Sequence, residues 1–413
     1  MRILMITEHF PPCVDSEAIV AGKLAKALVE AGVEVEVVAG NFAGTGRVVS
    51  DSPGWRNGLG SVTRLRSGVV DWRRDYWAKL RLLNEAGNAW SLAAYREGRR
   101  LLRETRFDLL ISRTWSVMAM IAAWRLHRPA LPWLAVINDP YPESLVPVGQ
   151  QPLPATARLR QALRRRFTRK ALARASAVAF PTDRLRQYME RRLGLDLAAK
   201  SIIVPHIGWK APIRRPLGQD RRVLNLLHCG YLSIARNSEA WLQAFHQAFS
   251  ERPDLKSRVM IHQIGPMRDA EFARKIKAYE LEENFSFRPT VGYEESLEYM
   301  AGADALLLVE SVLEEGIFLP SKFADYAGSG RPIIMFSPER GSISDLVGGF
   351  RHPGFLGQKP EQAAPRLRDF LSAWNRGGSL DDYRFPDPDR FAPAAVATTL
   401  LDELRRRWPE MGP

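Results

Sequence analysis

The sequence has few cysteines, no long apolar run and fewer acidic than basic residues. Its two cysteines, Cys13 and Cys229, cannot build a disulfide framework and lack the spacing of a metal-binding motif. A reducing, cytoplasmic compartment is therefore expected. No run of about 18 apolar residues is present, so no segment is expected to span a membrane. The apolar start, Met1–Ile6, is too short for a signal peptide and reads as a first strand.

The charge is strongly positive, with 59 Lys and Arg against 46 Asp and Glu and a formal net charge of +13. Nucleic acid, an anionic membrane surface or a phosphate-bearing substrate would each account for this balance, and so would a simple compositional bias. The length of 413 residues and a hydrophobic content of 46% are typical of a soluble globular protein with two ordinary domains.

Acidic, glycine and basic residues gather in one stretch, Asp304–Val347. Two apolar runs in it, Asp304–Val309 and Pro332–Phe336, are typical of strands buried on both faces of a sheet. Between them, Ser321 is predicted to cap a short helix that Gly330 closes. The intervening loop carries Glu310, Glu314, Glu315, Gly316, Pro320 and Lys322. Ligands bind at such strand ends in open α/β sheets, because helix N-termini favour anions.

This stretch resembles the donor-site signature of retaining, GT-B fold glycosyltransferases of family 4. The signature is a glutamate, a Gly-x-x-x-Pro turn, a second acidic residue on a helix, and Gly-x-Pro before a strand. The matching residues here are Glu315, Gly316, Pro320, Asp325, Gly330 and Pro332. The usual spacing would place the second acid at Phe323, so Asp325 is taken as its equivalent in a longer segment. Pro-Ser-Lys followed by Tyr326 is similar to a subgroup of bacterial surface-polysaccharide enzymes.

The resemblance implies that the second half binds a nucleotide-diphosphate sugar. Arg236 and Lys322 are expected to neutralise the diphosphate, so no metal ion or other cofactor is expected. Asp325 would bind the ribose hydroxyls, and Glu315 the donor sugar. The implied donor-binding residues are Gly230, Tyr231, Arg236, Gly265, Glu315, Gly316, Pro320, Ser321, Lys322 and Asp325. The implied catalytic residues are Asp139, Arg236, Lys322 and Glu315.

The first half opens as a strand–loop–helix–strand unit, the start of a Rossmann-like sheet. Its strands are predicted at Arg2–Thr7 and Val33–Ala39, and its helix at Ala18–Ala31. This unit resembles the start of the family 4 glycosyltransferases. Their first loop usually carries a glycine pair at the positions that Asp15 and Ser16 occupy here. Either residue is a candidate for the acceptor side of the site, or one of them only caps the helix.

A buried strand, Trp133–Ile137, ends in Asn138 and Asp139. The resemblance implies that Asn138 and Asp139 lie on the acceptor side, with Asp139 beside the reacting sugar. The alternative is that Asp139 caps a turn before Pro140. His228 and His262 stand inside apolar strands and are interpreted as core histidines, since no histidine–carboxylate set has metal-ligand spacing.

Two segments of the first half are rich in basic residues. Trp72–Arg106 mixes tryptophan, leucine and arginine, as suits an amphipathic helix on anionic lipid; a helix packed on the sheet is the alternative. Arg158–Arg192 has twelve basic residues and two acidic ones, Asp183 and Glu190. Such a run is a solvated face or a surface that binds phosphate groups.

Both halves alternate strand and helix, which predicts an α/β protein with two Rossmann-like, doubly wound domains facing a cleft, the GT-B fold. The segment 208–222 has prolines and no periodicity and is the predicted linker. The domains are therefore predicted at 1–207 and 223–391. The final helix, 392–413, is assigned to the first domain by resemblance, and the chain after Pro338, with Arg384–Phe391 as its clearest part, is expected to be rich in loops.

The function that the resemblance implies is transfer of a sugar, with retention, from a nucleotide-diphosphate sugar to an acceptor hydroxyl. The acceptor would be a saccharide or a lipid-linked molecule in cell-surface polysaccharide or glycolipid assembly, with the protein cytoplasmic or peripheral at the membrane. One alternative is a nucleotide-sugar epimerase on the same fold. The other is a basic nucleic-acid-binding protein, although no recognised nucleic-acid module is present.

Overall fold

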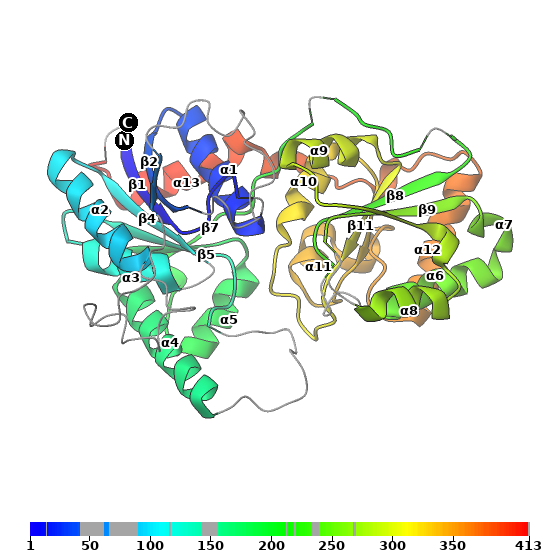
Figure 1. Ribbon diagram of the computed structural model, residues 1–413, viewed down its shortest axis with the longest axis horizontal. Helices are drawn as coiled ribbons and strands as arrows, with labels where there is room; N and C mark the ends of the chain where they lie inside the picture. The colour runs from blue at the N-terminus through cyan, green and yellow to red at the C-terminus, as the bar shows by residue number, and fades with distance from the viewer. Residues whose placement is uncertain are drawn as a thin grey trace. The chain divides into compact units, whose positions relative to one another are not determined.

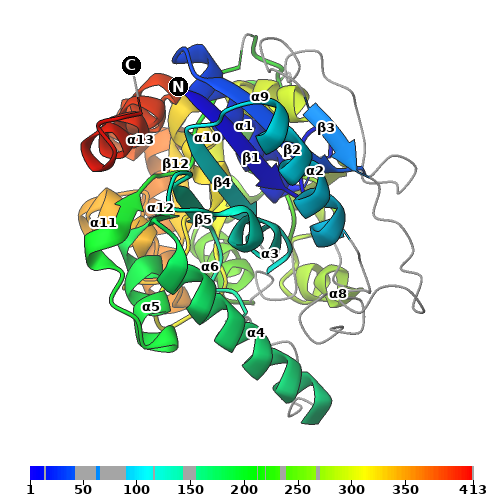
Figure 2. The ribbon, with the colours of Figure 1, turned by 90° about the vertical axis from the view of Figure 1, so that its left-hand side faces the viewer.

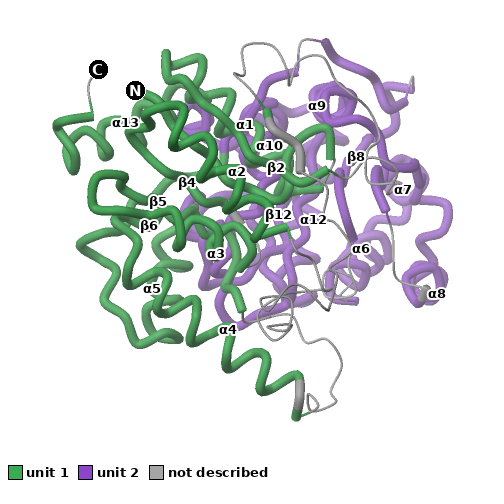
Figure 3. Tube along the Cα trace, turned by 60° about the vertical axis from the view of Figure 1, so that its left-hand side comes forward, with its two compact units in different colours: residues 1–206, 393–413 green, residues 207–392 purple. Residues whose placement is uncertain are grey.

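The computed structural model describes residues 1–13, 15–41, 62–65, 90–114, 117–142, 155–211, 213–218, 220–232, 239–266 and 270–411. They form two compact units, coloured separately in Figure 3. Unit 1 comprises residues 1–206 and 393–413, and unit 2 comprises residues 207–392. Each unit is a parallel sheet with helices packed around it (Figure 1).

Unit 1 contains a seven-stranded sheet in the order β3-β2-β1-β4-β5-β6-β7, with every neighbouring pair parallel. Its strands are β1 Arg2–Thr7, β2 Glu34–Gly40, β3 Val62–Leu65, β4 Leu109–Thr114, β5 Trp133–Ile137, β6 Ala177–Phe180 and β7 Ser201–Ile203. The chain order reverses at β1, where Ile3 pairs with Val35 of β2 on one side and Leu109 of β4 on the other. Loops after β1 and β4 therefore diverge at this point, which is where ligands bind in such sheets.

The helices of unit 1 include the last helix of the chain. They are α1 Ser16–Glu30, α2 Trp90–Glu104, α3 Val117–Leu126, α4 Ala155–Arg174, α5 Asp183–Leu193, the 3-10 helix Ala198–Lys200 and α13 Pro393–Arg407. Helix α13 packs against α1 and buries an apolar stripe that includes Val396, Leu400 and Leu404. Arg407 adds hydrogen bonds to the carbonyl oxygens of Ala199 and Ser201.

Unit 2 contains a five-stranded parallel sheet in the order β10-β9-β8-β11-β12. Its strands are β8 Leu224–Cys229, β9 Val259–Ile264, β10 Phe285–Arg288, β11 Ala305–Val309 and β12 Ile333–Phe336. The α-helices are α6 Glu239–Glu251, α7 Pro253–Lys256, α8 Ala270–Ala278, α9 Tyr293–Gly302, α10 Ser321–Ser329, α11 Ser342–Val347 and α12 Pro360–Asn375. The 3-10 helices are Glu282–Asn284, Gly349–Arg351, Asp381–Tyr383 and Pro388–Phe391.

Aromatic rings fill the core on one face of the second sheet. Trp241 of α6 is 1% exposed and lies 5.8–6.4 Å, centroid to centroid, from the rings of Phe245, Phe272, Phe285 and Phe336. Rings at such separations pack edge-to-face or tilted, and they bury large apolar areas. Helix α12 packs beside α6 over the same core.

Helix α12, Pro360–Asn375, corrects the expectation that the chain after Pro338 is rich in loops. Its 16 residues include Pro365 within the helix, and a proline there removes one backbone hydrogen bond. Burial of Leu367, Phe370 and Leu371 against the core stabilises the helix despite this loss. The expected cap at Ser321 is also wrong: Ser321 is the first residue of α10, Pro320 is the N-cap and no side chain caps the helix.

The α/β fold class predicted from the sequence, with a Rossmann-like parallel sheet in each half, is confirmed. Within the described ranges, no helix combines the length and the apolar character that a membrane span requires.

Candidate functional site

The predicted donor-binding residues of unit 2 stand where parallel strands end. Strand β8 leads into Gly230 and Tyr231, β9 into Gly265, and β11 into the loop that carries Glu315. Because β8 and β11 are neighbours at the point where the strand order reverses, these loops gather at one edge of the sheet. The site residues at this edge are Gly230, Tyr231, Gly265, Glu315, Gly316, Pro320, Ser321 and Lys322.

The side chain of Lys322, in the first turn of α10, reaches the end of β8. Its Nζ lies 3.1 Å from Nε2 of His228, and a Cβ added to Gly230 would lie 2.9 Å from the same Nζ. Gly230 has φ +118°, which L side chains rarely adopt. Glycine at this position therefore gives the chain its turn and leaves room for the ammonium group.

Gly265 is held tightly against Gly230. A Cβ on Gly265 would lie 2.7 Å from the carbonyl oxygen of Gly230, and its φ is +120°. The Gly230 N–H donates to Ile264 at 2.7 Å, and the Gly265 N–H donates to Arg288 at 3.2 Å. Both glycines therefore shape the edge of the sheet, and their N–H groups hydrogen-bond within the protein.

The loops after β11 and β12 are joined through a pair of glycines. The Gly316 N–H donates to Arg340 at 2.8 Å, and the Ser342 N–H donates to the Gly316 carbonyl at 2.7 Å. A Cβ on Gly341 would lie 3.1 Å from Gly316 Cα, so the two backbones approach as closely as glycine allows. Glu315 precedes this junction and is half-buried. The junction fixes the backbone next to its carboxylate.

Asp325 lies inside unit 2, within α10. Its Oδ1 accepts the Trp209 N–H at 3.0 Å and the Tyr293 hydroxyl at 2.9 Å, and the residue is 4% exposed. Burial, followed by the Asp325 charge and hydrogen bond, raises the pKa of Tyr293 well above its usual value. Ribose binding by Asp325 stays a prediction, and this geometry does not support it because the carboxylate joins α9, α10 and the chain at Trp209.

The other residues of α10 divide between two surroundings. Tyr326, one turn after Lys322, accepts the Cys229 N–H at 2.9 Å and ties the helix to the end of β8. Phe323 packs on Phe385 and Phe391, with ring centroids 5.3 and 5.9 Å away. The position where the family's spacing would place an acid is thus an apolar contact in this chain.

Arg236, the other predicted diphosphate cation, lies outside the described residues. Its role stays a prediction. Tyr231, which takes the place of the family's arginine, is 39% exposed. It is one of the few large apolar or aromatic side chains on the described surface with that much exposure.

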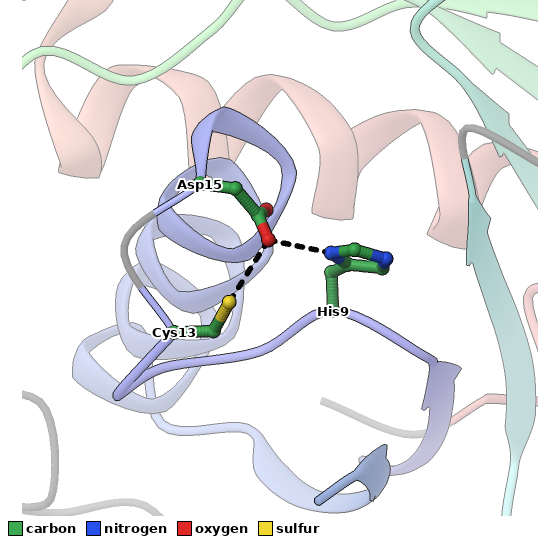
Figure 4. Close-up of side chains that lie close together, drawn as sticks. All are labelled: His9, Cys13 and Asp15. Carbon is green, nitrogen blue, oxygen red and sulfur yellow. Dashed lines mark hydrogen bonds and ion pairs between the residues drawn. The ribbon is translucent and has the colours of Figure 1, made fainter. Parts of the chain in front are cut away.

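In unit 1, three side chains of the loop between β1 and α1 converge (Figure 4). Asp15 caps α1, because its Oδ1 accepts the Ala18 N–H at 2.9 Å. Its Oδ2 accepts the Cys13 thiol at 2.9 Å and lies 2.6 Å from His9 Nδ1. Helix capping, one of the two interpretations open for this loop, is confirmed for Asp15, and Ser16 is the first residue of the helix.

His9 and Asp15 form an ion pair. Burial opposes charge on both groups, but the hydrogen bond and opposite charge of the partner outweigh it. The pKa of Asp15 is lowered to about 2, and that of His9 is raised. The ligand atoms of His9, Cys13 and Asp15 lie within 4.8 Å of one another, a cluster that the sequence spacing did not predict. The hydrogen bonds between them account for this proximity.

A buried arginine connects the ends of β4 and β5 with the start of α1. Arg113 is 1% exposed and donates to the Glu17 carbonyl at 3.0 Å. Asn138 Nδ2 donates to the Glu17 carboxylate at 3.0 Å. Burial lowers the pKa of Arg113, while Glu17, Asp139 and Asp15 favour its charge. Two of the predicted acceptor-side residues, Asp15 and Asp139, thus lie near an arginine that was not predicted as a site residue, although one arginine in an apolar strand was a signal.

The basic segments of unit 1 take two forms. The described part of Trp72–Arg106 is α2, whose Trp90, Ala94 and Leu101 are buried, so the packed-helix interpretation applies to it. Residues 72–89 lie outside the described ranges. Helix α4 extends beyond the rest of unit 1 (Figure 2). Its Leu159 is 55% exposed and is flanked by exposed arginines.

Residues 18–206 match the family of the glycosyl transferase 4-like domain. No curated protein matches the sequence. HepE of Anabaena, solved with UDP-glucose, has a TM-score of 0.66 at 14% identity, covering 98% of this chain and all of that one. WaaG, a glycosyltransferase involved in lipopolysaccharide biosynthesis, has a TM-score of 0.64 at 13% identity, covering 98% and 99%.

A third solved structure is a putative UDP-N-acetylglucosamine 2-epimerase from Listeria monocytogenes. Its TM-score is 0.56 at 12% identity, with coverage of 100% of this chain and 97% of that one. Because a putative epimerase shares the fold, the fold alone does not distinguish sugar transfer from epimerisation.

Two Rossmann-like parallel sheets, one in each unit, are the architecture of the GT-B class, and the solved structures share it along nearly the whole chain. The domain match covers most of unit 1. Residues 18–206 therefore match the glycosyl transferase 4-like domain, and the chain as a whole has the GT-B fold.

Proposed function

We propose that the protein transfers a sugar, with retention at the anomeric carbon, from a nucleotide-diphosphate sugar to an acceptor hydroxyl. The observation that carries this proposal is the position of Lys322. Its ammonium group stands over Gly230 at the end of β8, in the first turn of α10 and beside the point where the strand order reverses. A cation and a helix N-terminus at one strand end favour an anion there.

The chemistry needs a diphosphate leaving group whose developing charge is stabilised and a donor held against the acceptor. Lys322 supplies one cation, and Arg236 is proposed as the second because its guanidinium can form two parallel hydrogen bonds to phosphate oxygens. Glu315, beside the glycine junction, is proposed to contact the donor sugar. With two cations assigned to the diphosphate, the proposal includes no metal ion.

The acceptor side is proposed to lie in unit 1, at Asp15, Ser16, Asn138 and Asp139. Asn138 is linked to the start of α1 through Glu17, so the ends of β1 and β5 form one connected edge. The role of Asp139 beside the reacting sugar rests on the family resemblance. No general base is assigned.

A thermal-shift panel of UDP-, GDP-, dTDP- and ADP-sugars tests the function. A ligand that binds only the folded state raises the melting temperature in proportion to the logarithm of its concentration over Kd. We expect one nucleotide class to stabilise the protein. A flat response to all four would contradict the proposal.

Replacement of Lys322 by alanine tests the site. We expect kcat/KM to fall by about 30- to 1000-fold, the effect of losing about 2–4 kcal/mol of transition-state stabilisation. Arg236→Ala is expected to act similarly. Lys277→Ala, on the exposed face of α8, is the matched control and should leave turnover unchanged. Near-normal turnover in Lys322→Ala and Arg236→Ala would remove the phosphate-binding role.

Epimerisation of a nucleotide sugar is the second candidate, favoured by the structural likeness to a putative epimerase. Incubation of the donor without acceptor separates the two reactions. Release of free nucleotide or formation of an epimer, with no transfer product when acceptors are added, would favour epimerisation. Salt-sensitive binding to DNA with no response to any nucleotide sugar would instead favour a nucleic-acid-binding protein.

We also propose that the acceptor is a saccharide or lipid-linked intermediate of cell-surface polysaccharide or glycolipid assembly, reached from the cytoplasmic face of the membrane. The basic helix α4, with Leu159 exposed between arginines, supports contact with an anionic membrane surface.

A further inference from the structure

We propose that His228 and Gln263 are positioning residues that hold the ammonium group of Lys322 at the end of β8. This inference rests on the proposed function of that site as a diphosphate-binding site. It assigns a task to a histidine that the sequence analysis interpreted as part of the core.

The two residues form a cross-strand pair. His228 of β8 stands opposite Gln263 of β9 in the parallel register, and each is 1% exposed. His228 Nδ1 lies 2.6 Å from Gln263 Oε1, and Gln263 Nε2 donates to the Gly230 carbonyl at 2.8 Å. His228 Nε2 lies 3.1 Å from Lys322 Nζ. One chain of hydrogen bonds thus runs from the Gly230 carbonyl to the lysine.

This series of hydrogen bonds determines the tautomer of His228. The Gly230 carbonyl can only accept, so the amide nitrogen of Gln263 faces it and the amide oxygen faces His228. An amide oxygen also only accepts, so the proton of His228 is on Nδ1. Its Nε2 then presents a lone pair, and the Lys322 ammonium donates to it.

A neutral acceptor suits a lysine that binds phosphate. A lysine has a flexible four-carbon stem, and a fixed hydrogen-bond partner restricts where its charge lies. An aspartate or glutamate in the same place would restrict it equally but would neutralise the charge that the diphosphate needs. An imidazole restricts the ammonium and leaves its charge intact. Because the imidazole and its partner stand on two strands of the sheet, the position is defined more closely than a loop would define it.

Two substitutions at His228 test the roles of its two ring nitrogens independently. His228→Asn places an amide near the position of Nδ1, so it can keep the contact to Gln263 but offers nothing to Lys322. His228→Gln places an amide near the position of Nε2, so its oxygen can accept from Lys322. The probe is inorganic pyrophosphate, and its Kd for the full-length chain is measured by calorimetry, with Lys322→Ala as the reference for complete loss.

We expect His228→Asn to raise the Kd for pyrophosphate by about tenfold or more, the effect of losing a hydrogen bond to a charged group. His228→Gln should stay within about threefold of the natural protein, since it retains the acceptor. With the natural donor, His228→Asn should raise KM, because the diphosphate is already bound in the ground state, and should lower kcat, because the charge on the diphosphate grows in the transition state. The melting temperatures of the two variants are recorded alongside.

Several outcomes would overturn the inference. If Lys322→Ala abolishes pyrophosphate binding while His228→Asn leaves the Kd unchanged, Lys322 binds phosphate but His228 does not position it. Equal losses in His228→Asn and His228→Gln would mark His228 as a packing residue. If the natural protein binds neither pyrophosphate nor any nucleotide sugar, the proposed function itself fails. Should His228→Asn not fold, Gln263→Leu tests the same chain from its other end, and normal pyrophosphate binding there would refute the proposal.

Discussion

Asp15, the N-cap of α1 in unit 1, and Asp325, within α10 of unit 2, have surroundings that give them different tasks. Asp15 caps α1 with one oxygen and pairs with His9 through the other. Asp325 accepts two hydrogen bonds from groups inside unit 2. The resemblance to family 4 implies contact with acceptor and donor for them. In the structure, groups of the protein itself occupy hydrogen-bonding positions of both carboxylates.

The His9–Asp15 pair predicts a pH dependence of stability. The folded-state pKa of Asp15, about 2, is below its ordinary value of 3.8. Its contribution is therefore present above pH 4 and is lost as the pH falls toward 2. The pKa of His9 is raised above 6.5, so its contribution is present below pH 6.5 and is lost as the pH rises through the raised value.

Asp15→Asn isolates this pair because asparagine still caps a helix. We expect it to lower the free energy of unfolding by about 1–2 kcal/mol near pH 5.5, a value reduced for the partial exposure of Asp15. Urea unfolding at pH 5.5 and 2.5 measures the effect, and the difference from the natural protein should shrink at the lower pH. Asp15→Ala, which also removes the cap, should cost more. An unchanged difference at both pH values would contradict the ion pair.

Helix α10 combines the features of the site because three of its sides meet different neighbours. Lys322 and Tyr326 face the end of β8, Asp325 meets Trp209 and Tyr293, and Phe323 packs on aromatic rings near the end of unit 2. The residues that follow unit 1 in the chain, which the sequence presents as a linker, pack along this helix. A helix bound on so many sides holds its first turn, and therefore Lys322, in place.

Close backbone contact between α10 and this segment predicts a contrast between two glycines. A Cβ on Gly208 would lie 2.2 Å from the carbonyl oxygen of Ala324, so Gly208→Ala must shift backbone and should cost about 2–3 kcal/mol of stability. A Cβ on Gly328 would lie 3.6 Å from the Trp209 carbonyl, an ordinary contact. Gly328→Ala, within the helix, should be neutral or stabilising by up to about 1 kcal/mol. Thermal unfolding compares them, and equal effects would contradict the packing.

At the scale of the whole molecule, one architecture occurs twice without a close sequence repeat. Each unit has a parallel sheet with a reversal of strand order, and each places its candidate residues at the strand ends beside that reversal. The last helix, α13, belongs to unit 1, although residues 207–392, which separate it in sequence from the rest of unit 1, form unit 2. The strongly basic helix α4 also belongs to unit 1, and it is the surface proposed to meet the membrane.

The membrane proposal predicts flotation with liposomes that contain anionic lipid at low salt. Charge reversal at Arg158 and Arg160 should reduce the floating fraction, since each basic residue near an anionic surface contributes about 1 kcal/mol. The matched control reverses Arg405 and Arg406 of α13, which pair with Asp402 and Glu403, and should float normally. High salt or purely zwitterionic vesicles should abolish flotation. Failure to float at low salt would count against the proposal.

Sequence patterns predicted most of the fold because they are local. Continuous apolar runs such as Trp133–Ile137 and Asp304–Val309 mark strands buried on both faces, and glycines after helices mark their ends. The motif around Glu315 placed the second-half site residues at strand ends. Helix α12 was missed because Pro365 interrupts its period, and a buried face rather than propensity stabilises it.

The amino-acid sequence by itself determined the two alternating α/β halves and the edges at which their polar residues stand. Only the tertiary structure decided what those residues contact: His228 with Lys322, Asp325 with Tyr293, and Arg113 with Glu17. These partners are far apart in the chain, and a residue's type does not reveal which distant group will satisfy its hydrogen bonds. Burial makes that pairing obligatory, because an unpaired polar group in the interior costs free energy.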